Sequence, residues 1–266
     1  MSAPLAPVVA TGARIDTWFL CLARICRSLT PSSRREPSHG SWNEDDMKSD
    51  DFTPAAGVSW LTPFYDLGIA ALTREKRWRS LFVTQIRPQT QDVIIDVGCG
   101  TGSLLTLLAH SAPGVRLLGI DPDPTVLAKA RAKVAHVQPP VILRQGFARD
   151  ISAVAGGERA SKVVSSLVFH QVPVTEKRAG MKAMYAALAS GGEVHIADYG
   201  LQRTALMRTL FRLTVQNLDG VADTAPNARG MLPQLLSEVG FSDIRETAVV
   251  STVTGSISLY RAVRRS

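Results

Sequence analysis

Three glycines at alternate positions, directly after a short run of β-favouring and acidic character, constrain this chain of 266 residues more than any other feature. The run occupies residues 93–97, and the glycines are Gly98, Gly100 and Gly102. A leucine-rich segment with helical spacing follows them. The pattern predicts a buried strand, then a tight turn whose backbone approaches a ligand, and then a helix whose N-terminus lies beside that ligand.

Several nucleotide-binding folds place a glycine turn after a strand, and the residues around the turn distinguish them. A dinucleotide site uses Gly-x-Gly-x-x-Gly, but the last position of that pattern is Ser103 here. A phosphate-binding loop ends in Lys followed by Ser or Thr, and this turn lacks that pair. Asp96, two residues before the first glycine, repels a pyrophosphate and attracts an ammonium group. The turn therefore favours a cationic amino-acid nucleoside as the ligand.

A second acidic residue stands where the next predicted strand ends. Residues 115–120, mostly apolar, have the pattern of a strand that leads into Asp121, roughly twenty residues after the glycine turn. A carboxylate at that place can accept hydrogen bonds from ribose hydroxyls. Pro122 then interrupts the chain, and Thr125 is the predicted N-cap of the next helix.

Strand and helix patterns alternate from residue 92 onward, which predicts an α/β fold with a parallel sheet and helices on both faces. A helix over residues 231–239 is followed by two alternating runs, residues 244–250 and 256–262, which predict an antiparallel hairpin. We expect the preceding strands to begin near Val93, Val115, Val141, Lys162 and Glu193.

Together these motifs resemble the class I S-adenosylmethionine-dependent methyltransferases, and among them the ubiquinone/menaquinone-methyltransferase-like group that acts on small molecules. The resemblance covers about residues 58–263; it rests on residues 96–102 and is supported by residues 119–121, 165–170, 190–192 and 196–199. It implies a Rossmann-like fold, in which a doubly wound, mostly parallel seven-stranded sheet ends in an antiparallel C-terminal hairpin edge. It also implies S-adenosylmethionine as the cofactor.

The resemblance further implies which residues hold the cofactor. Asp96 and the glycine turn would hold the methionine moiety, Asp121 the ribose, and Tyr65, in a Tyr-Asp pair, would lie over the cofactor. Many relatives have Gly-Asp-Ala where this chain has Gly146-Phe147-Ala148, so Phe147 would pack on the adenine instead of making a polar contact. The complete predicted set is Tyr65, Asp96, Gly98, Cys99, Gly100, Thr101, Gly102, Asp121, Pro122, Gly146, Phe147, Ala148, Ser165 and Leu167.

Methyl transfer from a sulfonium needs an acceptor held in line in a dry pocket and, for some acceptors, the removal of a proton. The candidate catalytic residues follow the fourth and fifth predicted strands and are His170, Asp198 and Tyr199. A neutral imidazole with an ordinary pKa could act as the base at His170; the alternative is a histidine that bonds a backbone carbonyl. For Asp198 and Tyr199 the alternative is a cap of the following segment.

The chain is predicted to divide into a poorly ordered N-terminal extension, residues 1–51, and a methyltransferase domain, residues 52–266. Within the domain, residues 60–86 and 201–230 are predicted caps over the carboxyl ends of the strands, where ligands bind in open α/β sheets. Their apolar content favours a lipophilic or aromatic acceptor.

Composition limits the compartment and the partners. Three cysteines, one of them in the glycine turn, and the lack of a membrane-spanning apolar run predict a cytoplasmic protein. The five histidines lack metal-ligand spacing, so no metal is predicted. The net charge of +7 is dispersed and aromatic residues make up 6%, which disfavours nucleic acid and leaves weak contact with a membrane surface open.

The predicted function is methyl transfer from S-adenosylmethionine to a small lipophilic or aromatic acceptor. A non-catalytic binding protein with the same fold is an alternative, motivated by Phe147. An RNA methyltransferase is a further alternative, motivated only by the positive charge. RNA enzymes of this fold often carry Asn/Asp-Pro-Pro-Tyr/Phe after the fourth strand, and this chain has Ser-Ser-Leu-Val at residues 165–168.

Overall fold

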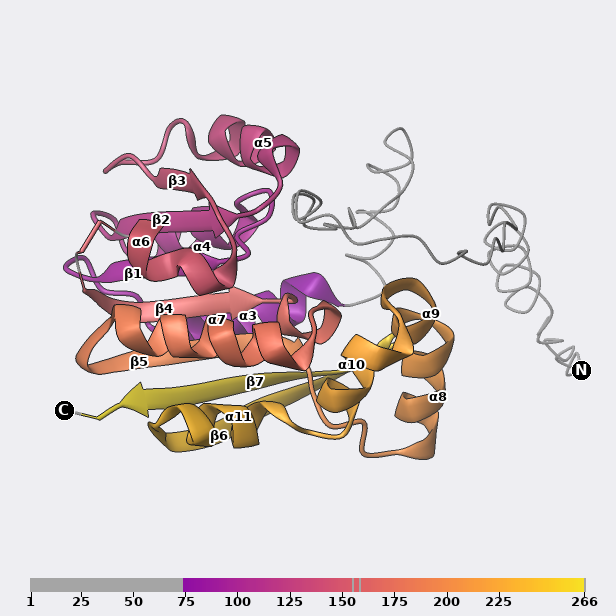
Figure 1. Cartoon of the computed structure of the whole chain (residues 1–266). Helices are drawn as coiled ribbons and strands as arrows, with labels where there is room; N and C mark the ends of the chain where they lie inside the picture. The colour runs from indigo at the N-terminus through magenta and orange to yellow at the C-terminus, as the bar shows by residue number, and fades with distance from the viewer. Residues whose placement is uncertain (1–73, 155, 158, 266) are drawn as a thin grey trace, which may run out of the picture. The chain divides into compact units, whose positions relative to one another are not determined.

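Seven strands form one sheet with the order β3-β2-β1-β4-β5-β7-β6 (Figure 1). The computed structural model describes residues 74–265 except 155 and 158, so the predictions for residues 1–51 and for Tyr65 lie outside the described residues. Strands β1 to β5 pair in parallel, whereas β7 pairs antiparallel with both β5 and β6. The strands are β1 (Val93–Val97), β2 (Arg116–Asp121), β3 (Ile142–Gln145), β4 (Ala160–Ser166), β5 (Leu188–Tyr199), β6 (Phe241–Thr252) and β7 (Gly255–Arg264). The predicted fold, a mostly parallel sheet with an antiparallel C-terminal edge, is confirmed.

The strand starts agree with the sequence prediction except at β5, which begins five residues earlier than expected. The ladder between β4 and β5 is irregular at its start, with a register shift between Ala160 and Lys162. Regular pairing begins where Lys162 faces Glu193, the two residues at which the sequence predicted the strands to start. Gly191 has a φ of 74°, so residues 190–192 form an irregular start of the strand.

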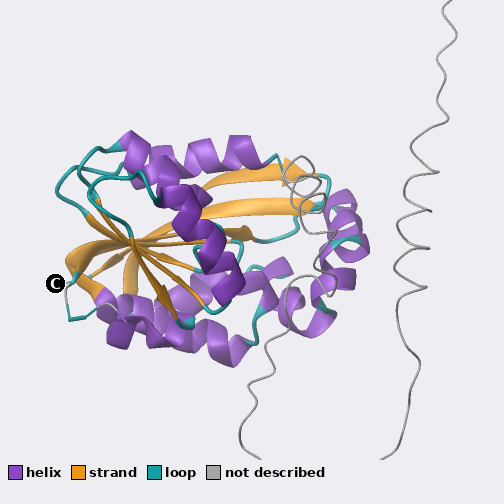
Figure 2. Cartoon of the chain, turned by 90° about the horizontal axis from the view of Figure 1, so that it is seen from above, coloured by secondary structure: helices purple, strands orange, loops and turns teal. Residues whose placement is uncertain are grey.

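Helices cover both faces of the sheet, as Figure 2 shows from above. Helices α3 (Glu75–Ile86), α4 (Ser103–Ser111) and α5 (Pro124–Val134) share one apolar core with the sheet. Helices α6 (Ile151–Val154), α7 (Val174–Ala187) and α11 (Leu232–Val239) share another. Successive strand residues contribute to opposite cores, since Ile94 packs in the first and Ile95 in the second. Two short 3₁₀ helices, η1 (Ala148–Asp150) and η2 (Phe169–Gln171), complete this part of the chain.

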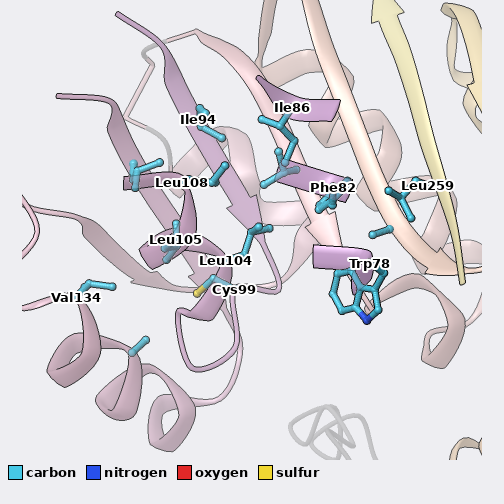
Figure 3. Close-up of a cluster of buried hydrophobic side chains, with 14 of the residues drawn as sticks. Trp78, Phe82, Ile86, Ile94, Cys99, Leu104, Leu105, Leu108, Val134 and Leu259 are labelled. Atoms are coloured by element: carbon cyan, nitrogen blue, oxygen red, sulfur yellow. The ribbon is translucent and has the colours of Figure 1, made fainter. Parts of the chain in front are cut away.

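The position of α3 bears on the predicted cap over residues 60–86, which stays a prediction. Residues 75–86 were expected to belong to a cap over the carboxyl ends of the strands. Trp78, Phe82 and Ile86 are fully buried in the first core, where Figure 3 shows them beside Ile94 and Leu259 of the sheet. Burial of three large apolar side chains holds this helix on the face of the sheet. Residues 60–73 lie outside the described residues.

Three helices follow β5 and form the second predicted cap region: α8 (Ala205–Leu213), α9 (Val215–Asp219) and α10 (Val221–Ala228). Helix α8 packs on α9 and β7, and α10 packs on α9 and η2 (Figure 1). This region therefore adjoins the turn after β4, and its role as a cap over an acceptor stays a prediction. Among the described residues, no helix has both the length and the apolar composition needed to cross a bilayer.

Candidate functional site

The glycine turn leads from β1 into α4 and has a left-handed backbone at each glycine. The φ angles are 71° at Gly98, 53° at Gly100 and 77° at Gly102. A Cβ atom at Gly98 would lie 2.2 Å from Cγ2 of Val168, whereas a Cβ at Gly100 would meet nothing within 4 Å. Gly98 is therefore required for packing against the turn after β4, and Gly100 exposes backbone beside open space.

Asp121, at the tip of β2, holds the glycine turn in place. Its Oδ2 accepts a hydrogen bond of 2.9 Å from the N–H of Gly100, and its Oδ1 accepts one of 3.0 Å from the N–H of Asp123. Burial raises the pKa of this carboxyl, and the two backbone donors oppose the shift. Each carboxylate oxygen keeps a further lone pair, so Asp121 can hold the turn and still accept from ribose hydroxyls.

Asp96 is buried at the end of β1, and neither of its carboxylate oxygens has a hydrogen-bond partner within the part of the chain that the structure describes. Burial raises the pKa of this carboxyl to about 7; the charge of Arg79 opposes the shift and that of Asp121 adds to it. An unpaired buried carboxylate is unfavourable until a cationic donor reaches it. The ammonium group of an amino-acid nucleoside is such a donor, so Asp96 and the turn fit the predicted cofactor.

Two further residues of the glycine turn have structural contacts. Cys99 is buried, and burial together with the charge of Asp96 raises the pKa of its thiol well above the ordinary value. Its Sγ lies where a side chain at Gly119 would need to be, so it fills the space between the turn and β2. The hydroxyl of Thr101 accepts a hydrogen bond of 3.0 Å from Lys133 on α5.

The segment after β3 lies beside the tip of β2. The N–H of Gly146 donates to the backbone carbonyl of Asp121 at 3.2 Å, and the carbonyl of Pro122 accepts from the Gln145 side chain at 3.0 Å. Phe147 is half-buried, and the guanidinium of Arg149 lies 4.5 Å from the centre of its ring. The predicted adenine-side residues are thus adjacent to Asp121.

Ala148 and Ser165 have packing and backbone contacts. A Cβ at Gly180 of α7 would lie 2.9 Å from the Cβ of Ala148, so these two residues bring η1 close to α7. The Ser165 hydroxyl donates to the carbonyl of Val97 at 2.8 Å and joins β4 to β1. Both residues help to shape the site through the backbone.

Leu167 marks a strained turn at the end of β4. Its φ is 58°, a left-handed value that is unfavourable for a leucine, and its N–H donates to the carbonyl of Ala197 at 2.9 Å. The next residue, Val168, is the one that contacts Gly98. The strained turn therefore lies directly against the glycine turn.

The Asp198 carboxylate organises the turn after β4. Its Oδ2 accepts from the backbone N–H groups of Val168 at 3.1 Å and Phe169 at 2.6 Å. Its Oδ1 accepts from Nδ1 of His170 at 2.7 Å and from the N–H of Tyr199 at 2.7 Å. Four donors satisfy this buried group, so Asp198 acts as a positioning residue for the turn and for His170.

His170 is buried between two carboxylates. Its Nδ1 faces Asp198, and its Nε2 lies 3.4 Å from Oδ2 of Asp219 at the end of α9. Burial lowers the pKa of the imidazole, but Asp198 and then Asp219 raise it more, to a net value of about 9. This differs from the neutral imidazole of ordinary pKa that the sequence suggested, because the sequence did not show that Asp198 bonds His170 and gave no sign of Asp219.

Tyr199 is buried on the other side of His170, and the two rings meet edge to face with centroids 5.0 Å apart. Its hydroxyl forms a hydrogen bond of 2.8 Å with the hydroxyl of Thr254. Of the three predicted catalytic residues, His170 alone contacts a partly exposed carboxylate among the described residues: its Nε2 faces Asp219. The structure therefore brings all three together but gives them different surroundings.

Comparisons with known proteins agree with this geometry. A family model described as "Methyltransferase domain" matches residues 94–192. The demethylmenaquinone methyltransferase of Chlorobaculum tepidum is 28% identical over 164 residues, which cover 59% of this chain and 64% of that protein. The protein of the same name from Chlorobaculum parvum is 26% identical over 204 residues, covering 68% of this chain and 81% of that protein.

A solved structure of an O-methyltransferase family protein from Burkholderia thailandensis superposes with a TM-score of 0.62 at 16% identity. The superposition covers 80% of this chain and 62% of that one. Residues 94–192 therefore match a methyltransferase domain, and the chain is similar to the class I S-adenosylmethionine-dependent methyltransferases. The predicted family and its cofactor, S-adenosylmethionine, are thereby confirmed, although the matches cover slightly less than two thirds of the C. tepidum and B. thailandensis proteins.

Two side chains around the site, Asp219 and Lys177, were missed by the sequence analysis. Asp219 faces His170, and the buried ammonium of Lys177 donates to the backbone carbonyls of Val172 and Asp223. Burial lowers the pKa of Lys177 to about 8, which the charges of Asp198 and Asp223 partly oppose. These contacts join α9 and α10 to the turn after β4, and no local motif marks them. A lysine in the first turn of a predicted helix was the one available signal.

Proposed function

We propose that the protein transfers a methyl group from S-adenosylmethionine to a lipophilic aromatic acceptor of the quinone class. The observation that carries the proposal is the buried carboxylate of Asp96, which has no partner among the described residues and precedes the glycine turn, where a Cβ on Gly100 would meet nothing within 4 Å. The relatives from two Chlorobaculum species, which are named for demethylmenaquinone, support the class of acceptor.

The binding roles follow from the surroundings of each residue. Asp96 would accept from the ammonium group of the methionine moiety, because it is the buried anion without a donor. Asp121 would accept from the ribose while its backbone contacts keep the turn in place. Phe147, half-buried beside the tip of β2, would pack on the adenine in place of a polar contact. When bound, S-adenosylmethionine supplies an activated methyl group on a positively charged sulfur.

Proton removal would fall to His170. The reaction balances when the acceptor atom gains the methyl group and loses a proton while the sulfonium becomes a neutral thioether. Nε2 of His170 can take that proton when Asp219 no longer faces it, and Asp198 holds the ring through Nδ1 throughout. Because two carboxylates raise the pKa of His170 to about 9, the neutral form that can accept a proton increases as the pH rises toward that value.

Titration calorimetry with S-adenosylmethionine, S-adenosylhomocysteine and NAD tests the binding half of the proposal. We expect the first two to bind and NAD not to bind. Asp121→Ala should weaken cofactor binding by about 1–3 kcal/mol, the range for polar groups left unpaired at a buried site. Asp123→Ala is the matched control. Asp123, and not Thr125 as the sequence predicted, caps α5 by accepting from the N–H groups of Thr125 and Val126, so this variant should affect stability more than affinity.

A methyl-transfer assay with labelled S-adenosylmethionine and reduced quinones of increasing chain length tests the catalytic half. Transfer to the quinol ring is the expected result. Tight cofactor binding without transfer to any quinol or phenol would favour the non-catalytic alternative. Binding of NAD with no response to S-adenosylmethionine would overturn the proposal as a whole.

A further inference from the structure

Large apolar side chains are exposed on the region after β5. Five of the ten exposed large apolar side chains of the described residues lie within residues 201–221. We call them the cap patch: Leu201, Leu206, Leu213, Leu218 and Val221. Leu206 is 62% exposed, Leu213 55% and Val221 61%. Packing of these helices on the core does not explain why such large apolar side chains face solvent.

Helix α8 places this patch on its outer side. Phe211 is buried and its ring packs against Tyr199, which fixes the inner side of the helix. Leu206 and Leu213 are seven residues apart and therefore lie on one stripe of the helix, away from Phe211. Helix α9 packs beside α8 and carries Leu218, and Val221 begins α10 (Figure 1).

The charge of this segment is mostly positive. Residues 201–221 contain three arginines and one acidic residue, Asp219, which faces His170. Arg203 pairs with Glu246, whereas the guanidinium of Arg208 donates to the backbone carbonyls of Gln202 and Arg203. Arg208 and Arg212 form no ion pair with any carboxylate in the described part of the chain. Two positive charges therefore remain beside the exposed leucines.

We propose that the cap patch docks on the surface of an anionic phospholipid membrane. Exposed leucines flanked by arginines are the combination that places an apolar stripe among lipid headgroups while the guanidinium groups meet lipid phosphates. Anionic lipid also complements a chain with a net charge of +7. A second copy of this chain is disfavoured as the occupant, because two such surfaces would bring arginines of like charge together.

The docking surface also has a suitable position. The cap patch follows β5 and belongs to the region joined to the turn after β4 by Lys177 and by His170 with Asp219. A lipophilic acceptor could then reach the site directly from the bilayer. Entry of the acceptor from the bilayer rests on the proposed function. The docking itself involves neither cofactor nor acceptor.

Vesicle flotation of the full chain tests the proposal without any cofactor. The probes are vesicles of phosphatidylcholine containing phosphatidylglycerol and vesicles of phosphatidylcholine alone. We expect binding to the anionic vesicles, weaker binding in higher salt, and little binding to the neutral ones. The double variant Leu206→Gln, Leu213→Gln should reduce the partition coefficient about tenfold or more, because two apolar side chains no longer enter the headgroup region.

A matched control uses exposed apolar residues outside the cap patch. Leu107 on α4 and Ile142 on β3 are 39% and 51% exposed, so Leu107→Gln, Ile142→Gln makes the same change elsewhere and should leave vesicle binding unaltered. Arg212→Gln should weaken binding about fivefold in low salt. Equal losses in the two double variants, or no binding to anionic vesicles, would overturn the proposal.

Sedimentation analysis of the same variants tests the alternative occupant of the cap patch, a second copy of this chain. Concentration-dependent dimerisation that the cap double variant abolishes, together with unchanged vesicle binding, would assign the cap patch to a second copy. Calorimetry with S-adenosylmethionine on each variant keeps the two proposals apart, since cofactor affinity should not change when membrane docking is lost.

Discussion

The end of β1 and the end of β5 each carry a buried aspartate, and the two are satisfied in opposite ways. Asp198, after β5, receives four hydrogen bonds, three from backbone N–H groups and one from His170. Asp96, at the end of β1, receives none within the described residues. The same residue type at the same edge of one sheet therefore serves architecture in one place and is left available for a ligand in the other.

The difference indicates which half of the site needs a ligand to be complete. The half around β4 and β5 supplies its own counter-charges, since Asp198 and Asp219 both face His170. The half around β1 and β2 lacks a donor for Asp96, and burying that charge lowers the stability of the fold until a cation arrives. Four predictions test this contrast.

The largest expected effect is on turnover. His170→Gln should lower turnover by about 10²–10⁴-fold with little change in cofactor affinity, as expected for loss of a general base. In the unsubstituted protein the rate should rise with pH toward about 9, because the carboxylates around His170 raise its pKa to about that value. Steady-state kinetics across pH with a quinol acceptor would measure both.

His195 provides the control for that variant. It is a second buried histidine, with its Nε2 3.0 Å from Glu193, but it lies in the middle of β5. His195→Gln should leave turnover per folded molecule nearly unchanged. A similar loss of turnover in both variants would show that His170 acts through folding alone.

The next effect is on stability. Asp198→Asn should lower the free energy of unfolding by about 3–5 kcal/mol, because it removes one member of a buried charged pair. The sign of the pH dependence follows from His170, whose pKa is raised from 6.5 to about 9 by folding. Its contribution is complete below pH 6.5 and is lost as the pH rises through 9. Denaturant unfolding at several pH values should show that decline in the unsubstituted protein and a flatter profile in the variant.

Asp96→Asn should raise the stability of the fold, unlike Asp198→Asn, and should weaken cofactor binding. At pH 8 the free energy of unfolding should rise by about 1–3 kcal/mol, because an amide replaces a buried unpaired charge. Cofactor affinity should fall about 10- to 100-fold, since the ammonium group loses its anion. Asp92→Asn, at the other end of β1, is the contrast: Asp92 is paired with Ser161 and Lys162, so that variant should be less stable and bind normally. Destabilisation by Asp96→Asn would contradict the assignment.

The smallest expected effect is the pH dependence of cofactor binding. Burial raises the pKa of Asp96 to about 7, so the fraction in the charged form falls as the pH drops below 7. Affinity should therefore decrease by up to about tenfold per pH unit in that range. Calorimetry near pH 7 in buffers of different ionisation enthalpy should detect a proton released on binding. Asp96→Asn should remove this release, and its persistence would point to another group.

The sequence predicted the fold well, and the residues it proposed for the cofactor lie on adjacent strands, because both signals are local. A strand, three alternate glycines and a helix are contiguous, and Asp121 closes the next strand in the same pattern. Strand alternation also placed the antiparallel hairpin correctly. These features depend on short stretches whose conformation is set by neighbouring residues.

The acceptor half depends on contacts between distant residues, which a single sequence does not reveal. Asp219 is far along the chain from His170, and nothing in its own surroundings marks it as a partner. The pKa of His170 could not be predicted without that contact and the one to Asp198. Likewise, the amphipathic pattern of α3 does not distinguish a helix over the sheet edge from one on the sheet face.

The contact between Gly98 and Val168 has a consequence for His170. With Cγ2 of Val168 so close that no Cβ could fit on Gly98, the glycine turn and the strained turn at Leu167 leave no slack between them. The second turn leads directly into His170. Any side chain at position 98 should therefore disturb the surroundings of His170 as well as the glycine turn.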